Sequence, residues 1–284
     1  RRYGTASAAR ERSMKGLLHG TWHGDMGADP GLLAGFRAAE KDNFRHWITT
    51  DGTSDFAAEP GRYHLYVSHA CPWANRAITY RKLKGLEDVI SMSVAHPVWG
   101  GPMGWTFADT EFSTRDHAGS RDYLHEIYQA AKPNFTGKVT VPVLWDKKSK
   151  AIVNKESGDI IRILDSAFDA WGDASARFYP DDLAADIEAM NARILPKVCM
   201  GVYECGFAGE QAAYDDAVGE LFTTLDELDA RLSAQPYLLG GRITESDWHL
   251  FMTLVRFDAV YHTRLKCTVR RLTDYPNLSR YTRR

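Results

Sequence analysis

The sequence predicts an α/β domain followed by an all-helical domain, and three observations support this division. The chain of 284 residues exceeds the length of an average single domain. Segments that alternate polar and β-favouring residues occur before Trp171, whereas helical spacing of apolar residues dominates after it. We therefore predict an N-terminal extension over residues 1–60, an α/β domain over 61–172 and a helical domain over 173–284.

The first 60 residues show no sustained period of 2 or 3.6, so we expect an irregular extension. Its scattered aromatic residues predict how it packs onto the rest of the chain: Trp22, Phe36, Phe44, Trp47 and Phe56. We expect no catalytic role for His19, Trp22 or His23.

The α/β domain begins with a strand, a tight turn and a helix. Residues 61–68 alternate as a strand does, and apolar residues follow helical spacing from Cys71-Pro72 up to a stop at Gly85. A second strand is predicted at 89–94. The chain therefore places a cysteine at the start of a helix that directly follows a strand.

The remaining α/β elements follow a stretch rich in Gly, Pro and Trp over 96–112. A helix is predicted around 123–131, a hairpin from 140–145 and 151–153, and a helix after the hairpin. The order β-α-β, insert, β-β-α is that of a thioredoxin-like domain.

The helical domain carries one informative local pattern near its C-terminal end. Thr244 stands three residues before Asp247 at the head of an apolar segment, a variant of the capping box. It predicts a buried helix over about 246–259. A further helix start at 275–278 lies so close to Arg284 that we expect a C-terminal tail beyond the given sequence.

Composition excludes several classes of protein. Hydrophobic residues make up 44% and charged residues 25%, as in ordinary globular proteins. The net charge of −2 disfavours binding to nucleic acid or an anionic membrane. No apolar run approaches the roughly 20 residues of a membrane span, and the N-terminus lacks the apolar core of a secretion signal. We expect a cytoplasmic protein.

The four cysteines are scattered and include no C-x-x-C pair, which argues against a zinc site and a disulfide scaffold. The ten histidines show no metal-binding spacing, so we predict no metal. Free thiols in a reducing compartment fit best.

Cys71 has the strongest catalytic signal. At a helix N-terminus, unpaired N–H groups and the helix dipole favour the reactive thiolate. Pro72 suits the first helical turn, and Ala74 stands where a dithiol enzyme carries its second cysteine. A lone cysteine is more often a packing residue, but the strand, Cys-Pro, helix context favours catalysis. The packing interpretation is kept for Cys199, Cys205 and Cys267.

Cys71-Pro72-Trp73-Ala74 and its surroundings resemble the glutathionyl-hydroquinone reductases, the Xi class of the glutathione transferase superfamily. Further segments agree in the family's order: 104–107, 140–146, 154–157, 201–203, 206–207 and 254–258. The resemblance covers residues 22–278. Two positions depart from it, since the family usually has Asn or another small polar residue at Lys155 and commonly has Arg at Lys138.

Two segments are assigned to the glutathione main chain and its γ-glutamyl end. The Val141-Pro142 bond is typically cis in thioredoxin-like folds and faces the cysteine, which leaves the Val141 backbone able to pair with the cysteinyl unit. Glu156 and Ser157 open a helix, where Ser157 and N–H groups suit a carboxylate and Glu156 an ammonium group. A proline ending an edge strand and an ordinary helix cap are the alternatives.

Four more residues are candidate ligand contacts. Trp105 could lie along glutathione with Lys138 near the glycyl carboxylate, although a tryptophan can also fill a satellite core. The resemblance implies a phenol-binding pocket above Cys71 that includes Tyr203 and Tyr261, whose hydroxyls could bond a hydroquinone oxygen. Core packing is the alternative for both tyrosines.

The sequence therefore predicts a glutathione-dependent reductase of S-glutathionyl hydroquinones that works through a Cys71–glutathione mixed disulfide. Glutathione is the expected co-substrate, and the resemblance implies a homodimer. Two alternatives stay open. One is another cysteine-type transferase activity, such as dehydroascorbate reduction or deglutathionylation, and the other is a non-enzymatic scaffold with the same fold.

Overall fold

The structure is a computed structural model that describes residues 14–98 and 101–284. The described residues form two compact units, divided between Ala176 and Arg177. The predicted extension belongs to the first unit from residue 14 onward. Residues 1–13, where we expect no secretion signal, lie outside the described part of the chain.

The first unit is built on a four-stranded sheet in the order β6-β5-β7-β8. The strands are β5 (Tyr63–Val67), β6 (Ser91–Val94), β7 (Val143–Asp146) and β8 (Ala151–Asn154). β5 and β6 are parallel, whereas β7 is antiparallel to both β5 and β8. One edge of the sheet therefore gathers the C-terminal ends of β5, β6 and β8 with the start of β7.

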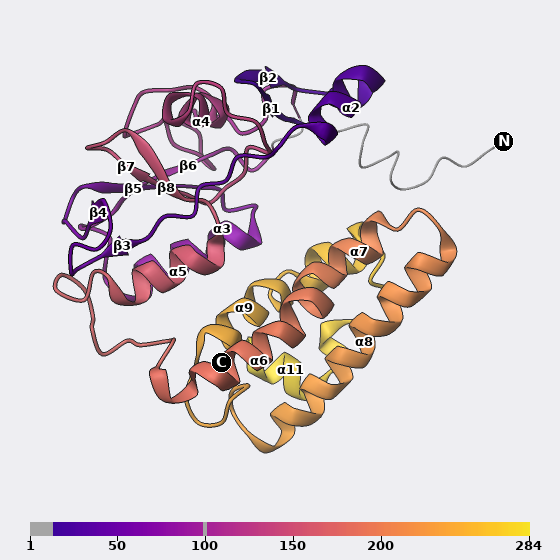
Figure 1. Cartoon of the computed structure of the whole chain (residues 1–284). Helices are drawn as coiled ribbons and strands as arrows, with labels where there is room; N and C mark the ends of the chain where they lie inside the picture. The colour runs from indigo at the N-terminus through magenta and orange to yellow at the C-terminus, as the bar shows by residue number, and fades with distance from the viewer. Residues whose placement is uncertain (1–13, 99–100) are drawn as a thin grey trace. The chain divides into compact units, whose positions relative to one another are not determined.

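Helices cover both faces of this sheet. α3 (Pro72–Leu83) and α5 (Ser157–Ser166) lie side by side on one face, and α4 (Leu124–Ala131) lies on the other (Figure 1). Gly85 follows α3 with φ +63, the left-handed conformation that makes glycine a helix stop. The arrangement confirms the predicted thioredoxin-like fold.

The extension is more regular than predicted. It contains short elements: β1 (Gly16–Leu18), β2 (Thr21–His23), η1 (Met26–Ala28), α2 (Pro30–Ala38), β3 (Ile48–Thr49) and β4 (Phe56–Ala57). α2 begins at Pro30 and is capped by Asp29, which accepts hydrogen bonds from two backbone N–H groups. Only Leu33 and Phe36 of this helix are buried, so its apolar pattern is too short to register as a period.

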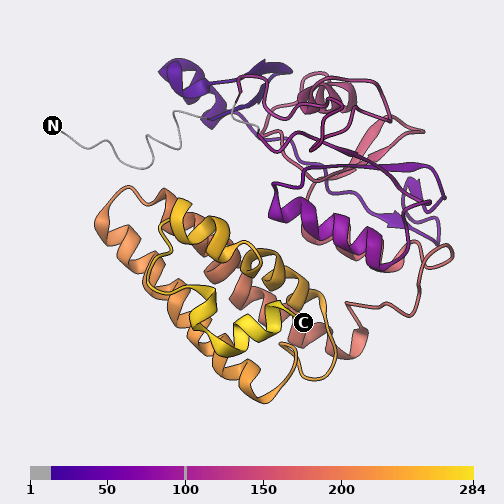
Figure 2. The same ribbon diagram turned by 180° about the vertical axis from the view of Figure 1, so that it is seen from behind.

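The named elements of the second unit, over its described range Arg177–Arg284, are all helices joined by loops. Its elements are η2 (Asp181–Leu183), α6 (Ala184–Ile194), η3 (Leu195–Met200), α7 (Gly201–Phe207), α8 (Gln211–Ala234), α9 (Glu245–Leu254), η4 (Phe257–Tyr261), α10 (His262–Arg264), η5 (Leu272–Asp274) and α11 (Pro276–Thr282). α8 packs against α7 and α11, and α6 lies beside α9 (Figure 2). Buried Leu221, Leu225, Leu250 and Phe257 form part of the core. No helix in the described chain is long and apolar enough to cross a membrane.

The capping box at Thr244 and Asp247 is present, but its helix ends earlier than predicted. α9 stops at Leu254 instead of continuing to about residue 259. Tyr261 N donates to Arg256 O, five residues back, so the following turn η4 is π-helical. Apolar spacing continues through this change of hydrogen-bond pattern, and the sequence therefore does not reveal it.

Candidate active site

Cys71 lies where the sequence predicts, at the N-cap of α3 just after β5. Its backbone is extended, with φ −94 and ψ 116, and its N–H donates to Ser68 O at 3.1 Å. Pro72 occupies the first helical turn. The cysteine is half-buried, and its Sγ is 3.6 Å from Val141 O.

The Val141–Pro142 peptide bond is cis, as expected, and it comes just before β7. β7 pairs with β5 so that Val143 stands opposite Tyr66. This register brings the loop with Val141 to the end of β5 and hence to the cysteine. An extended peptide paired with Val141 would thus lie beside the Cys71 sulfur.

The start of α5 lies at the same edge, after β8. Glu156 is the N-cap with its side chain 47% exposed, whereas Ser157 is buried. Asn154 Oδ1 accepts a hydrogen bond from Glu156 N at 2.8 Å, and buried Arg76 donates to Ser157 Oγ at 3.3 Å. Both residues predicted to bind the γ-glutamyl group are therefore fixed by hydrogen bonds, Glu156 through its backbone and Ser157 through its side chain.

Sequence reasoning assigned no role to Asn154 or Arg76. An asparagine two residues before a helix start is a recognisable signal, because its side chain readily bonds nearby backbone N–H groups. Arg76 gives no comparable signal. Its link to Ser157 depends on α3 and α5 packing side by side, which local pattern does not specify.

Trp105 and Lys138 lie on two further loops of this unit. The Trp105 side chain is largely buried, and its carbonyl accepts a hydrogen bond from Leu124 N at the start of α4. The next residue, Thr106, accepts from His96 N just beyond β6. Lys138 is exposed and lies between α4 and β7. Contact of either residue with glutathione stays a prediction.

The structure brings Tyr203 and Tyr261 together within the helical unit. Their hydroxyl oxygens are 3.5 Å apart, and their rings meet edge to face with centroids 5.8 Å apart. Tyr203 follows the π-helical turn η3, and Tyr261 ends the π-helical turn η4. Burial raises the pKa of Tyr261, so its hydroxyl stays protonated and can donate a hydrogen bond.

The other three cysteines occupy a different environment. All four cysteines are free thiols, but Cys199, Cys205 and Cys267 are buried in the helical unit. Hydrogen bonding with Cys205, together with burial, holds the pKa of Cys267 far above its usual range. A thiolate at Cys267 is therefore disfavoured.

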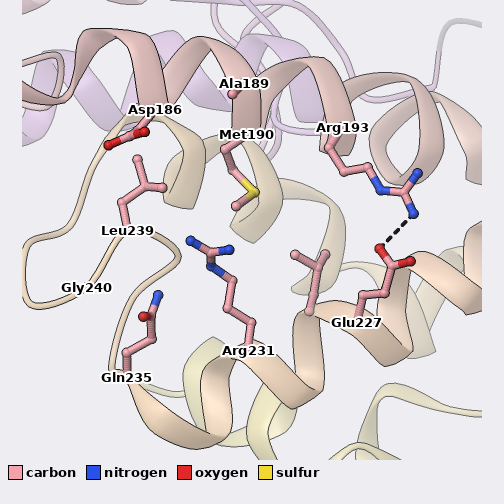
Figure 3. Close-up of a pocket in the computed structure, with 10 residues that line it drawn as sticks. Asp186, Ala189, Met190, Arg193, Glu227, Arg231, Gln235, Leu239 and Gly240 are labelled. Carbon is pink, nitrogen blue, oxygen red and sulfur yellow. Dashed lines mark hydrogen bonds and ion pairs between the residues drawn. The ribbon is translucent and has the colours of Figure 1, made fainter.

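A cavity of about 540 Å³ lies in the helical unit between α6, α8 and the loop that follows α8 (Figure 3). Arg193 and Glu227 form an ion pair at 2.7 Å on its wall, and Arg231 Nε donates to Leu238 O. None of the residues described as lining it is a cysteine or a predicted site residue. Among the described residues no His, Cys, Asp or Glu cluster is arranged to hold a metal ion.

Two protein families match parts of the chain. Residues 70–167 match the family described as Glutathione S-transferase, N-terminal domain. Residues 211–284 match the Glutathione S-transferase, C-terminal domain. The first match contains Cys71, Trp105, Lys138, Val141 and Glu156.

Similar proteins cover nearly the whole chain. Glutathionyl-hydroquinone reductase PcpF of Sphingobium chlorophenolicum is 45% identical over 264 residues, which cover 93% of this chain and 82% of that protein. Glutathionyl-hydroquinone reductase YqjG of Escherichia coli K12 is 45% identical over 274 residues, which cover 94% and 83%. The solved structure of a Xi class GST from Natrialba magadii has a TM-score of 0.90 at 44% identity, covering 96% of this chain and 83% of that one. The glutathione-bound structure of YqjG has a TM-score of 0.84 at 44% identity, covering 94% and 83%.

Proposed function

Because the chain belongs to the glutathionyl-hydroquinone reductases, the Xi class of the glutathione transferases, we propose that it reduces S-glutathionyl hydroquinones to hydroquinones at Cys71. The observation that carries this proposal is the position of the Cys71 sulfur. It lies at the N-terminus of α3 and 3.6 Å from the carbonyl of Val141, where a glutathione main chain would pair.

The reaction proceeds in two thiol exchange steps. The Cys71 thiolate attacks the glutathione sulfur of the substrate, and a disulfide bond forms as the bond from that sulfur to the ring carbon breaks. The ring carbon takes the electron pair and a proton, which gives the hydroquinone. A second glutathione thiolate then attacks the mixed disulfide, releasing oxidised glutathione and restoring Cys71. Ala74 leaves this second step to a thiol from solution.

Glutathione binds along the sheet edge that carries Cys71. Val141 pairs with the cysteinyl unit, Ser157 and the first N–H groups of α5 receive the γ-glutamyl carboxylate, and Glu156 receives its ammonium group. The bond from Arg76 to Ser157 Oγ supports this arrangement, since it leaves the serine hydroxyl able to donate to the carboxylate. Trp105 and Lys138 contact the remainder of the tripeptide.

The hydroquinone ring binds Tyr203 and Tyr261 of the helical unit. Two tyrosines in edge-to-face contact offer ring surface for packing and hydroxyls for the phenol oxygen. Because the Tyr261 hydroxyl stays protonated, it can donate to an oxygen on which charge develops as the ring accepts electrons.

A single-turnover experiment tests the proposal. With excess glutathionyl hydroquinone and no free glutathione, the enzyme should release about one equivalent of hydroquinone per active site in a burst. Intact-mass analysis should then find one glutathione attached at Cys71, and added glutathione should remove it. Steady turnover without glutathione, or an adduct on Cys199, Cys205 or Cys267, would contradict the mechanism.

The same experiment addresses the alternatives. Dehydroascorbate reduction and deglutathionylation share the Cys71 adduct, so relative rates across acceptors distinguish them, whereas a scaffold would form no adduct.

We also propose a cytoplasmic location, supported by four free cysteines that suit a reducing compartment. A homodimer, implied by the family resemblance, is tested by light scattering.

A further inference from the structure

The N-terminal segment, residues 14–46, contacts three loops that carry the proposed glutathione-binding residues. These are the loop with Trp105, the loop with Lys138 and the start of α5. Each connects different secondary-structure elements of the first unit. The contacts are made largely to backbone atoms of the loops, so they fix the path of the main chain.

The first contact is made by Trp22 to the loop before Trp105. Its Nε1 donates to Pro102 O at 3.0 Å, and its ring stacks on His125 with centroids 4.5 Å apart and planes 9° apart. Gly104 has φ +74, and a Cβ placed there would lie 3.0 Å from the Trp22 ring. The close fit of Trp22 against Gly104 therefore sets the backbone position directly before Trp105.

The second contact joins the segment to the loop before Lys138. Asp42 Oδ2 accepts a hydrogen bond from Thr136 N at 2.7 Å, and Asp42 N donates to Thr136 O at 2.9 Å. Leu17, which is fully buried, exchanges both backbone hydrogen bonds with Gly137. These four hydrogen bonds, with a fifth from His19 N to Thr136 Oγ1 at 2.9 Å, hold the two residues that precede Lys138.

The third contact reaches the start of α5. Arg45 donates to both carboxylate oxygens of Asp159, each at 2.7 Å, and His46 O accepts from Asn154 Nδ2 at 3.0 Å. Asn154 in turn accepts the Glu156 N–H. The segment therefore bonds the same asparagine that holds the N-cap residue of the helix.

We propose that the N-terminal segment is a positioning element of the glutathione site, with Trp22 as its principal residue. The inference rests on the proposed function, because it takes Trp105, Lys138 and Glu156 as glutathione contacts. Loops that must be ordered by the ligand reduce its affinity, and loops ordered beforehand do not. The segment orders all three before glutathione arrives, so its loss should weaken glutathione binding more than it slows the chemical step.

The test uses the full chain with Trp22→Ala. We expect the dissociation constant for glutathione, measured by calorimetry, to rise about tenfold, and kcat at saturating glutathione to stay within about twofold. Trp22→Phe keeps a ring to stack on His125 but removes the N–H, so it should lie between the wild type and Trp22→Ala. The double variant with Trp105→Ala should bind no more weakly than Trp105→Ala alone, because Trp22 acts through that loop.

Two further variants complete the design. Leu225→Ala removes a buried side chain from the core of the helical unit, outside the segment, so it should lower the melting temperature with an unchanged dissociation constant. Arg45→Ala alters an exposed side chain, is therefore expected to fold, and should weaken glutathione binding severalfold. Together with Trp22→Phe, it carries the test if Trp22→Ala fails to fold.

An unchanged dissociation constant in both Trp22→Phe and Arg45→Ala would overturn the inference, as would additive effects of Trp22→Ala and Trp105→Ala. Unchanged binding in Trp105→Ala alone would remove the premise for the Trp22 contact and overturn that part. The proposed function is judged separately, by whether the wild-type enzyme gives the Cys71 burst.

Discussion

At the N-termini of α2 and α9, a side chain of the protein accepts hydrogen bonds from backbone N–H groups and so caps the helix. In the described chain, the N-termini of α3 and α5 lack such a cap. Asp29 caps α2, and the Asp247 carboxylate accepts the Thr244 N–H at 2.8 Å at the head of α9. The N-cap residues of α3 and α5 are Cys71 and Glu156. Within the described structure, neither of these N-cap side chains makes a capping hydrogen bond.

The difference shows that the unpaired backbone N–H groups at a helix N-terminus can serve two purposes. A capping side chain satisfies backbone N–H groups and contributes about 1 kcal/mol to stability. The same groups, with the positive end of the helix dipole, can instead stabilise a thiolate or a carboxylate ligand. In this chain the capped helices α2 and α9 lie outside the proposed site. Of the described helices whose N-cap side chain makes no capping hydrogen bond, which also include α6, α7, α8 and α11, it is α3 and α5 that carry the proposed nucleophile and γ-glutamyl contacts.

Cys71→Ser should give the largest effect and separate the two purposes. Reductase turnover should fall by about 1,000-fold or more, because a hydroxyl is a poor nucleophile without a neighbouring base. Serine is a good N-cap residue, so the free energy of unfolding should rise by about 0.5–1 kcal/mol. Initial rates and chemical denaturation measure the two changes.

The matched control is Cys205→Ala, which alters a buried cysteine of the helical unit. It should lose some stability through packing but keep reductase turnover. Glutathione binding by Cys71→Ser should also persist, since its other contacts remain. Reductase turnover retained in Cys71→Ser would show that another residue is the nucleophile.

The parts of this site that could be predicted from sequence are those encoded by neighbours in the chain. The strand before Cys71, Pro72 after it and the missing cysteine at Ala74 are all adjacent, and the structure places Cys71 at the helix start as predicted. The Val141–Pro142 bond was likewise expected to be cis and is cis.

The parts that were missed depend on contacts between distant segments. Arg76 meets Ser157 only because α3 and α5 pack together, and Trp22 meets Pro102 across 80 residues of chain. α2 is too short to show a period, and the end of α9 is a change of hydrogen bonding within continuous apolar spacing. Local pattern reports neither kind of feature.

Asp247→Ala should remove the cap of α9 and so test what a capped helix start contributes. The Asp247 carboxylate is buried and accepts hydrogen bonds from Thr244 N, Thr244 Oγ1 and Leu238 N. Its removal leaves these donors without that acceptor, so the free energy of unfolding should fall by about 2 kcal/mol. Turnover per folded enzyme should stay close to that of the wild type, as measured by denaturation and by rates at saturating substrate.

Asp247→Asn is the milder comparison. Burial raises the pKa of Asp247, so the folded protein binds a proton there more tightly than the unfolded chain does. Protonation of Asp247 therefore adds to the free energy of unfolding. This stabilisation is fully present below the unfolded pKa of about 3.9 and is lost as pH rises through the folded pKa. Because Asn is neutral and keeps an acceptor, Asp247→Asn should remove this pH dependence and cost less than Asp247→Ala. An equal cost would show that charge is essential to the cap.

Glu156→Ala should give the smallest effect and tests the ligand side of the comparison at α5. If Glu156 receives the γ-glutamyl ammonium, its loss should raise the glutathione dissociation constant by about tenfold, far more than it alters Cys71 reactivity. Lys155→Ala is the matched control. Lys155 Nζ lies 3.2 Å from Glu156 Oε1, so the lysine pairs with the carboxylate that is proposed to bind the γ-glutamyl ammonium.

The two neighbouring substitutions should therefore act in opposite directions. Removing Lys155 frees the Glu156 carboxylate for the ligand, and since a half-exposed pair is worth little, glutathione affinity should hold or rise no more than severalfold. Calorimetry on both variants measures the difference. If Glu156→Ala leaves the dissociation constant unchanged, Glu156 serves only as the start of α5, and the absence of a side-chain cap there needs no ligand to explain it. If Lys155→Ala instead weakens binding as strongly as Glu156→Ala, the lysine itself contacts glutathione, through the γ-glutamyl carboxylate that the N-terminus of α5 already favours.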